Sequence, residues 1–426
     1  MKRHDSFAAT LLIAMLAGGA TAAPFTSGST GVDGALEFPV GDGSPSTVVF
    51  DPATNVPPLD VDGDGVYHFT TVTIPANVTV RLRADKCGFK PLFWLASGAV
   101  TIAGTLDLSG EDPAELPAGT ITYPTIPGPG GFPGGVASVS PETLGSPGFG
   151  PGGGIVQGYE GSHATGGART FFSPAVYGTE FLVPLIGGSG GAGGPYPQGT
   201  YTTVFTGGAG GGAILIASDV SIAVSGTINA QGGISPGRAG EPDGAHGQGG
   251  FSGDGAGGAI RLLAPSVVGE GSLLAGQTDT RFSYGGLGRV RIESDNPTGF
   301  SGSIVGVSRR VTLHHEAALG LPSQMVPQQI RTARVGGETI PMLPTGAFTP
   351  PDALIGSDQP VLVEFEASNI PLDATVTLYL FAGGQMLPPV VADPLTGTVA
   401  NSTTTLSTTF PTGLTKGIVT ATWIPQ

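Results

Sequence analysis

The chain has 426 residues and a formal net charge of −15, with 17 Lys and Arg against 32 Asp and Glu. So few cations exclude a nucleic-acid-binding protein, because phosphates are bound mainly by Lys and Arg. One cysteine, Cys87, excludes an intramolecular disulfide, and its most economical interpretation is a small buried hydrophobic residue. The 74 glycines and 38 prolines accompany few charges and 39% hydrophobic residues. This composition argues against disorder and favours a folded β-protein with glycine turns.

The N-terminus has the pattern of a secretory signal peptide. Lys2 and Arg3 precede an apolar stretch from Phe7 to Leu16, and the small residues Ala20-Thr21-Ala22 follow. The apolar stretch is too short to span about 30 Å of hydrocarbon. We therefore expect residues 1–22 to be removed, which makes the mature chain one unit more acidic. The expected location is outside the cell or on its outer surface, with the periplasm as the alternative.

Residues 23–65 are expected to form an irregular leader that ends in an acidic turn. The motif Asp60-Val61-Asp62-Gly63-Asp64 resembles the start of a calcium loop, because carboxylates alternate before a glycine turn. The closing glutamate is absent, since the twelfth position is Thr71. Asp60, Asp62 and Asp64 are therefore a candidate calcium site, and a solvated Asp/Gly turn is the alternative. Calcium is the one candidate cofactor.

Internal repeats dominate residues 66–300. The run Gly211-Gly212-Ala213-Ile214-Leu215-Ile216-Ala217 recurs as Gly257-Gly258-Ala259-Ile260-Arg261-Leu262-Leu263-Ala264, with a weaker copy at 288–293 and an earlier relative at 92–97. Apolar residues alternate within each copy, which predicts strands with one buried face. Stacked copies could bury a face that one copy cannot. The predicted fold is all-β: a right-handed parallel β-solenoid, with an ordinary β-sandwich as the rival.

A long glycine- and proline-rich insertion, about 111–205, interrupts these repeats. Its apolar run 181–186 predicts that part of it packs back onto the repeats. The glycine-only stretches could be mobile or could form tightly packed glycine layers, and composition does not separate the two.

The C-terminal part changes composition. Residues 301–360 contain scattered prolines and are predicted to form a linker. From residue 361 on, Thr, Val and Leu are frequent and glycine is rare. The stretches 361–367, 374–381, 403–410 and 417–423 predict strands of a small immunoglobulin-like β-sandwich over 361–426. We expect this sandwich to cover strand edges at an end of the repeat region.

No pattern in the chain has the specificity of a catalytic motif. Gly187-Gly188-Ser189-Gly190-Gly191 matches a nucleophile elbow in letters only, because glycine flanks do not form the required strand and helix. The repeat places Asp107 beside Asn229, so a catalytic carboxylate pair would be broken there. His314-His315-Glu316 would alternate in direction along a strand, which disfavours a shared metal ion. Whether the protein is an enzyme is left open, with the balance against it.

The repeat motifs together with Pro184 to Gly191 and the tail Ala367-Ser368-Asn369-Ile370-Pro371-Leu372 resemble a group of uncharacterised glycine-rich secreted bacterial proteins. The resemblance implies a parallel β-helix-like repeat region and a C-terminal β-sandwich tail domain. It brings no activity and no catalytic residues.

Two functions remain as expectations. The first is a secreted or cell-surface structural, adhesin-like protein without catalytic activity, with extracellular polysaccharide or surface components as partners. It binds no nucleic acid, and no membrane span remains after signal cleavage. The alternative is a carbohydrate-binding or polysaccharide-active β-helix protein, which would align exposed aromatic residues near carboxylates. The residues to inspect are Tyr159, Tyr177, Tyr196 and Tyr201.

Overall fold

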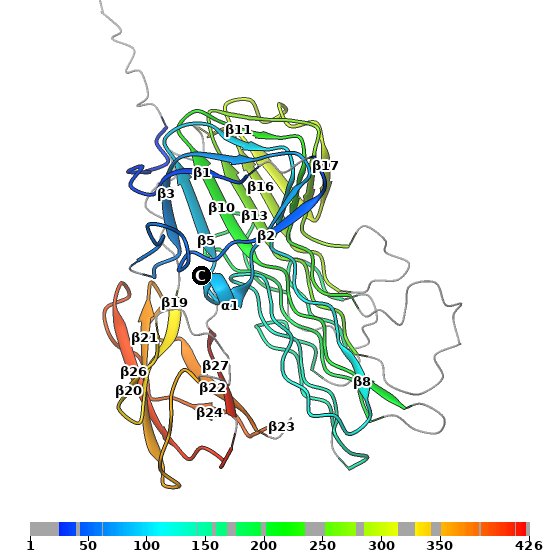
Figure 1. The fold of residues 1–426 in the computed structure, drawn as a ribbon, viewed down its shortest axis with the longest axis vertical. Helices are drawn as coiled ribbons and strands as arrows, with labels where there is room; N and C mark the ends of the chain where they lie inside the picture. The colour runs from blue at the N-terminus through cyan, green and yellow to red at the C-terminus, as the bar shows by residue number, and fades with distance from the viewer. Residues whose placement is uncertain are drawn as a thin grey trace, which may run out of the picture.

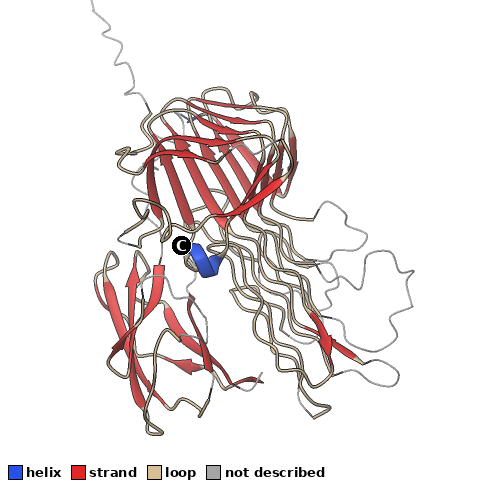
Figure 2. Ribbon diagram, in the orientation of Figure 1, coloured by secondary structure: helices blue, strands red, loops and turns tan. Residues whose placement is uncertain are grey.

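The computed structural model describes residues 25–39, 43–61, 63–142, 144–155, 159–167, 176–196, 202–234, 252–277, 285–313, 329–341, 351–382, 385–413 and 415–422. It is built almost entirely from strands and extended segments, and the one helix in these ranges is the single turn α1, Ala84–Cys87. Figure 1 shows a curved sheet at one end, with a glycine-rich bundle and a C-terminal body beneath it. Figure 2 shows that regular strands make up the curved sheet and the C-terminal body, whereas the bundle is mostly loop-like backbone. An all-β class is therefore compatible with the structure.

The main sheet has ten parallel strands in the order β14-β11-β6-β3-β5-β10-β13-β16-β18, with β1 on β3. Alternate residues point inward and form one hydrophobic core, in which Trp94, Ile216, Leu262 and Ile292 stack on successive strands. The strands are β1 Gly34–Glu37, β3 Val66–Ile74, β5 Leu92–Ala96, β6 Val100–Ile102, β10 Ala213–Ser218, β11 Ser221–Val224, β13 Ala259–Leu263, β14 Ser266–Val268, β16 Arg289–Glu293 and β18 Val307–Val311.

A second parallel sheet closes the other side of this core, in the order β17-β15-β12-β7-β4-β2. Its short strands bury their central residue, as Leu106 and Ile228 show, and turn the flanking polar residues outward. The strands are β2 Ser46–Val49, β4 Val78–Arg81, β7 Thr105–Asp107, β12 Thr227–Asn229, β15 Ser272–Leu274 and β17 Ser303–Val305.

The predicted right-handed β-solenoid is wrong. The main sheet is a parallel half-barrel, because the long strand β3 pairs with β5 through its first residues and with β6 through its last ones. Both halves of the sheet are thereby joined into one curved layer. The repeats did predict which segments stack, since β10 pairs in register with both β5 and β13. They did not predict curvature, because curvature depends on how one strand bends between two partners.

The flanking segments contribute more to the sheets than the sequence indicated. The leader supplies β1 and β2, which pair with β3 and β4. Residues 303–311, expected in the linker, supply β17 and β18 of the half-barrel. Short strands with few apolar residues bury little surface by themselves, so their pairing depends on the sheet edge that receives them. The signal-peptide prediction lies outside the described residues.

The long insertion forms an ordered bundle of extended segments over its described residues. Its ends are joined by the antiparallel pair β8 Glu115–Pro117 and β9 Thr203–Phe205. Segment 187–194 runs through the bundle, and its amides bond with a three-residue period: Gly188, Gly191 and Gly194 donate to the carbonyls of Gly211, Gly208 and Phe205. Three residues per turn is the period of the polyproline II helix, whose backbone groups point outward. Segment 187–194 thus has the hydrogen-bond period of such a helix and is bonded side by side with neighbouring segments.

Glycine is required here because the backbones nearly touch. A Cβ on Gly190 would lie 1.9 Å from the carbonyl oxygen of Pro133, and one on Gly193 would lie 1.8 Å from that of Val136. The side chains allowed inside are small: Ser189 and Ala192 occupy the third positions and are fully buried. The sequence left open whether the glycine-rich stretches are mobile or tightly packed. The described part of the insertion is tightly packed.

The C-terminal body consists of two antiparallel sheets that share a hydrophobic core including Phe365, Leu378 and Leu406. The body begins before residue 361, because β19 of the expected linker pairs with β21. It contacts the bundle where the rings of Tyr379 and Phe149 meet edge to face at 4.9 Å. The sheets contain β19 Gln329–Val335, β20 Glu338–Thr339, β21 Val361–Ser368, β25 Thr396–Gly397 and β26 Ser402–Thr408, and β22 Thr375–Ala382, β23 Gln385–Met386, β24 Val390–Val391 and β27 Thr415–Thr422.

Candidate functional site

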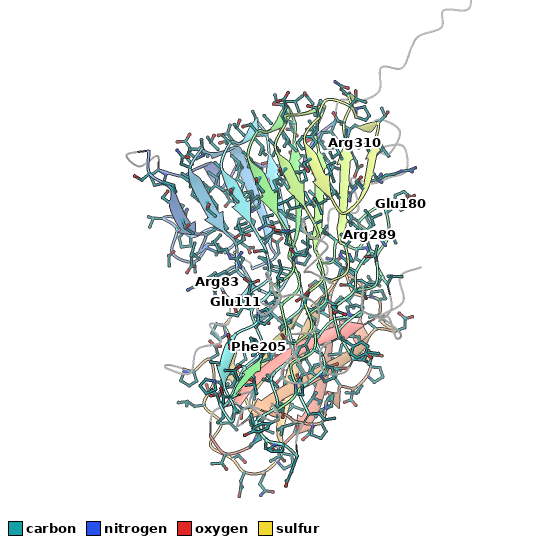
Figure 3. All side chains as sticks on the ribbon, turned by 90° about the vertical axis from the view of Figure 1, so that its right-hand side faces the viewer. Arg83, Glu111, Glu180, Phe205, Arg289 and Arg310 are labelled. Carbon is teal, nitrogen blue, oxygen red and sulfur yellow. The ribbon has the colours of Figure 1, made fainter. Side chains whose placement is uncertain are left out.

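A polar groove of about 420 Å³ lies where the second sheet of the half-barrel continues into the glycine-rich bundle. Figure 3 shows this junction from the side, with Arg83 and Glu111 at its edge and Phe205 further down the bundle. The groove is lined by Arg81, Ser109, Gly110, Glu111, Asp112, Asn229, Gln231, Gly232, Ile234 and Gln277. Its walls therefore carry charged, amide and hydroxyl groups and almost no apolar side chain.

Strand register aligns the first row of the groove. Arg81 of β4 lies opposite Asp107 of β7, which lies opposite Asn229 of β12. Each of these residues ends its strand and points outward, because the preceding residue fills the core. The repeat predicted the neighbourhood of Asp107 and Asn229, and Asn229 Nδ2 does donate to Asp107 Oδ1 at 3.1 Å.

Asp107 is held on both oxygens. Arg81 Nη1 lies 2.6 Å from Oδ2, and the Ser109 amide donates to Oδ1 at 3.0 Å. Arg81 is fixed in turn by the Ser109 carbonyl, which accepts from Nη2 at 2.9 Å. A carboxylate bound by a guanidinium and two further donors is a structural acceptor, not a free general acid or base.

The other groove carboxylates are bound as well. Glu111 Oε1 lies 2.9 Å from Arg83 Nη1, and Oε2 accepts from the Ile126 amide at 2.8 Å. Asp112 Oδ1 accepts from the Ile234 amide at 2.7 Å. The hydrogen bond to Asp85, ahead of the contact with Glu111, raises the pKa of Arg83, which stays charged. Glycoside hydrolysis needs two carboxyls available to substrate and water, and none in the groove has both oxygens available.

Two glutamines, Gln231 and Gln277, fix the far wall of the groove. Gln231 Nε2 donates to the Gly276 carbonyl at 2.8 Å and to Gln277 Oε1 at 3.1 Å. Gln277 Nε2 donates to the Gly232 carbonyl at 2.6 Å. Neither residue is among the site residues predicted from the sequence. The signal was present, because Gln231 follows Asn229 in one repeat copy and Gln277 follows the equivalent strand of the next copy.

The predicted calcium loop is occupied by a lysine. Lys90 Nζ lies 3.3 Å from Asp60 Oδ2 and also contacts the Gly63 carbonyl. Asp60 is buried and accepts from the Gly65 amide, and Asp64 accepts from the Val66 amide at 2.7 Å. Burial, opposed by Lys90, raises the pKa of Asp60 to about 6. Asp62 lies outside the described residues. Calcium would have to displace the ammonium group, and the described residues include no group of three or more His, Cys, Asp or Glu placed to hold a metal ion.

The candidate tyrosines that the structure describes do not form a platform for sugars. Tyr177 stacks on His163 with ring centroids 4.8 Å apart, and its hydroxyl donates to the Gly187 carbonyl at 2.6 Å. Tyr159 and Tyr196 are half-buried, and Tyr201 lies outside the described residues. Ser189 of the apparent nucleophile elbow is buried, and its hydroxyl donates to Tyr177 at 2.9 Å. His314, His315 and Glu316 also lie outside the described residues.

His163 is the one histidine buried inside the described part of the bundle. Its Nδ1 lies 2.9 Å from the Gly257 carbonyl, and burial lowers its pKa to about 4. The folded protein therefore holds His163 neutral at a pH where an unfolded histidine takes up a proton.

This shift predicts a loss of stability in acid. A histidine with a folded pKa near 4 and an unfolded pKa near 6.5 destabilises the fold as the pH falls below 6.5, by about 2 kcal/mol at pH 5. Urea unfolding at pH 7 and pH 5 measures the loss, and His163→Gln controls for the remaining titrating groups. The loss should be about 2 kcal/mol smaller in the variant, and equal losses in both proteins would contradict this assignment.

Cys87 is buried against the Phe50 carbonyl, 3.6 Å from its Sγ, and burial raises its pKa to about 12. The thiolate is the reactive form of cysteine. We expect a thiol reagent to leave the native protein unmodified at pH 8 and to label it fully in denaturant. Labelling of the native protein at the rate of a free thiol would show that this segment opens.

Comparisons of the chain with protein-family models, with curated proteins and with solved structures find no match. Over the described residues, no helix has the length and apolar character needed to cross a membrane. What the protein does must therefore be argued from its own geometry.

Proposed function

We propose that the protein is a secreted or cell-surface structural protein of adhesin-like type, without catalytic activity. The observation that carries this proposal is the bundle, in which amides and carbonyls of 187–194 bond to neighbouring segments on several sides. Such a body is stiff, because its shape is set by close backbone contacts that leave no room for a Cβ at the glycine positions. The predicted signal peptide supports an extracellular location.

Absence of catalysis is proposed from the groove chemistry. Asp107, Glu111 and Asp112 each accept hydrogen bonds from donors of the same chain. Asp107 and Glu111 are bound on both oxygens, so a reaction would have to break one of these bonds before either could take up a proton. Incubation of the mature protein with any polysaccharide that it binds should release no reducing ends, and release of them would overturn this part of the proposal.

Binding of extracellular polysaccharide is the second candidate, and the groove is the observation that favours it. Fixed guanidinium, carboxylate and amide groups suit a ligand rich in hydroxyls, because each hydroxyl both donates and accepts. The described lining of the groove contains no tyrosine, so a ligand there would be bound mainly through hydrogen bonds. A single groove is therefore expected to bind a polysaccharide weakly. Many copies of the protein on one surface would bind the same polymer more strongly.

A glycan array with residues 23–426, in calcium and in chelator, tests this second candidate. Gln231→Ala removes a groove amide and should weaken binding about tenfold if one hydrogen bond to the ligand is lost. The matched control Gln359→Ala changes an exposed glutamine of the C-terminal region. Binding that Gln231→Ala leaves unchanged would show that the groove is not the binding site. If no glycan binds with calcium or with chelator, the structural function is the one candidate that remains.

A further inference from the structure

The outer face of the half-barrel carries a ladder of arginines near its last strand. Register places Arg261 of β13 opposite Arg291 of β16, and Arg291 opposite Arg309 of β18. Neighbouring strands are about 4.8 Å apart, so three guanidinium groups follow one another closely. Arg289 lies two residues before Arg291 on the same face. On the preceding strands the same row holds Leu215 and Phe93, so the basic character is confined to this end.

Few of the carboxylates that the structure describes lie beside the ladder. Arg261 Nε and Arg291 Nε both bond to the single oxygen Oε1 of Glu293, at 2.8 and 2.9 Å, and all three residues are buried. Glu180 lies 3.9 Å from Arg309 and attracts Arg289. Glu293 and Glu180 are the carboxylates that the structure describes beside Arg261 and Arg289, in a protein that is strongly acidic elsewhere. A buried guanidinium group is costly unless a counter-charge joins it.

Two donors at this site have no partner among the residues that the structure describes. Arg261 Nη2 is fully buried, and Arg289 Nε is covered although its side chain is only half-buried. Arg289 Nη2 already donates to the Tyr177 and Gly178 carbonyls, each at 3.2 Å, so its position is fixed. Buried donors are normally satisfied, and guanidinium groups bind planar or tetrahedral oxyanions in two-pronged geometry.

Solvent reaches the ladder at its outer end. The Arg309 side chain is 58% exposed and the Glu180 side chain beside it 51%. Figure 3 shows Glu180 and Arg289 together at this side of the half-barrel. Arg310 of the same strand lies on the opposite face, where its Nη1 donates to the Phe300 carbonyl at 2.8 Å. An anion arriving from solvent therefore meets Arg309 first.

We propose that this arginine ladder is a binding site for an oxyanion group, a sulfate, phosphate or carboxylate, approached at Arg309 and Arg289. The site lies apart from the polar groove and does not depend on the function proposed for it. The oxyanion can be free in solution or attached to an acidic extracellular polymer, since both present the same chemistry to the guanidinium groups.

Isothermal titration calorimetry on residues 23–426 tests the site, with inorganic sulfate and phosphate at constant sodium chloride, and with dextran sulfate against neutral dextran. Arg309→Gln removes an exposed guanidinium without touching the buried part and should weaken binding about tenfold. The matched control Arg334→Gln removes a guanidinium of similar exposure, 55%, from the C-terminal body. Arg289→Gln provides a second variant at the fixed donor.

Saturable binding that falls in both ladder variants and stays unchanged in the control is the expected result. If dextran sulfate binds and the inorganic anions do not, the ligand is an oxyanion group carried by a polymer. If inorganic sulfate or phosphate binds and dextran sulfate does not, the ligand is a free ion. No saturable binding of any probe overturns the proposal, and so does binding that Arg309→Gln leaves unaltered.

Discussion

Gly190→Ala should destabilise the protein by about 3 kcal/mol or more, although it adds a single methyl group. The new Cβ would lie 1.9 Å from the Pro133 carbonyl oxygen, and backbone on both sides has no space to retreat. Gly190 also donates to the Phe149 carbonyl and accepts from the Gly154 amide, so a shift breaks hydrogen bonds to the same neighbouring segment. Urea unfolding measures the free energy, and limited proteolysis shows whether the bundle opens first.

Gly356→Ala is the matched control. No atom lies within 4 Å of the Cβ position at Gly356, and its backbone is not in the left-handed region. Its free energy of unfolding should change by less than about 1 kcal/mol. Equal stability of the two variants would mean that the bundle is loosely packed and that glycine serves there only as a flexible spacer.

Glu293→Gln should cost about 3–5 kcal/mol, because it leaves Arg261 and Arg291 buried beside a neutral amide. The change is nearly isosteric, so lost charge and not lost volume explains the result. Arg291 keeps its bond to the Glu180 carbonyl and its contact over the Phe181 ring, 5.3 Å from the centroid. These contacts reduce the loss of unfolding free energy that comes from Arg291. Most of the loss is therefore expected to come from Arg261.

Glu366→Gln removes the same charge from an exposed pair with Arg331 and should change the unfolding free energy by less than about 1 kcal/mol. Urea unfolding of the two variants measures the difference: if the dependence of the unfolding free energy on urea concentration is the same in both, the shift in midpoint reports the change in stability. If Glu293→Gln is as mild as Glu366→Gln, then another group already neutralises Arg261, and the oxyanion site loses the argument from its buried charge.

Sequence repeats predicted strand pairing in this protein better than they predicted shape. The copies aligned Ala213–Ser218 with Ala259–Leu263 in the observed register. They also identified Leu92–Ala96 as a neighbour, but one residue out of register, because Ala217 lies opposite Leu95 and not opposite Ala96. The curvature into a half-barrel was not predictable from those copies. It depends on β3, whose nine residues pair with two strands at once.

The bundle and the groove were only partly predictable. A glycine-rich run is compatible with mobile chain and with close packing, and the difference lies in distant partners such as Pro133 and Gly253, which local sequence does not name. The pair of Asp107 and Asn229 followed from the repeat, whereas Lys90 in the predicted calcium loop did not. Lys90 lies 30 residues from Asp60 in sequence, and only folding shows that its ammonium group occupies the turn.

Amide hydrogen exchange in residues 187–194 of the native mature protein is the most direct test of the stiff scaffold. Every donor in this segment that the structure pairs, such as Gly188, Gly191 and Gly194, is bonded to a carbonyl of a neighbouring segment. Exchange should therefore be slowed to the level of β10 in the half-barrel, Ala213–Ser218. Exchange at the rate of an unstructured glycine-rich loop would contradict the packed bundle and with it the proposed structural function.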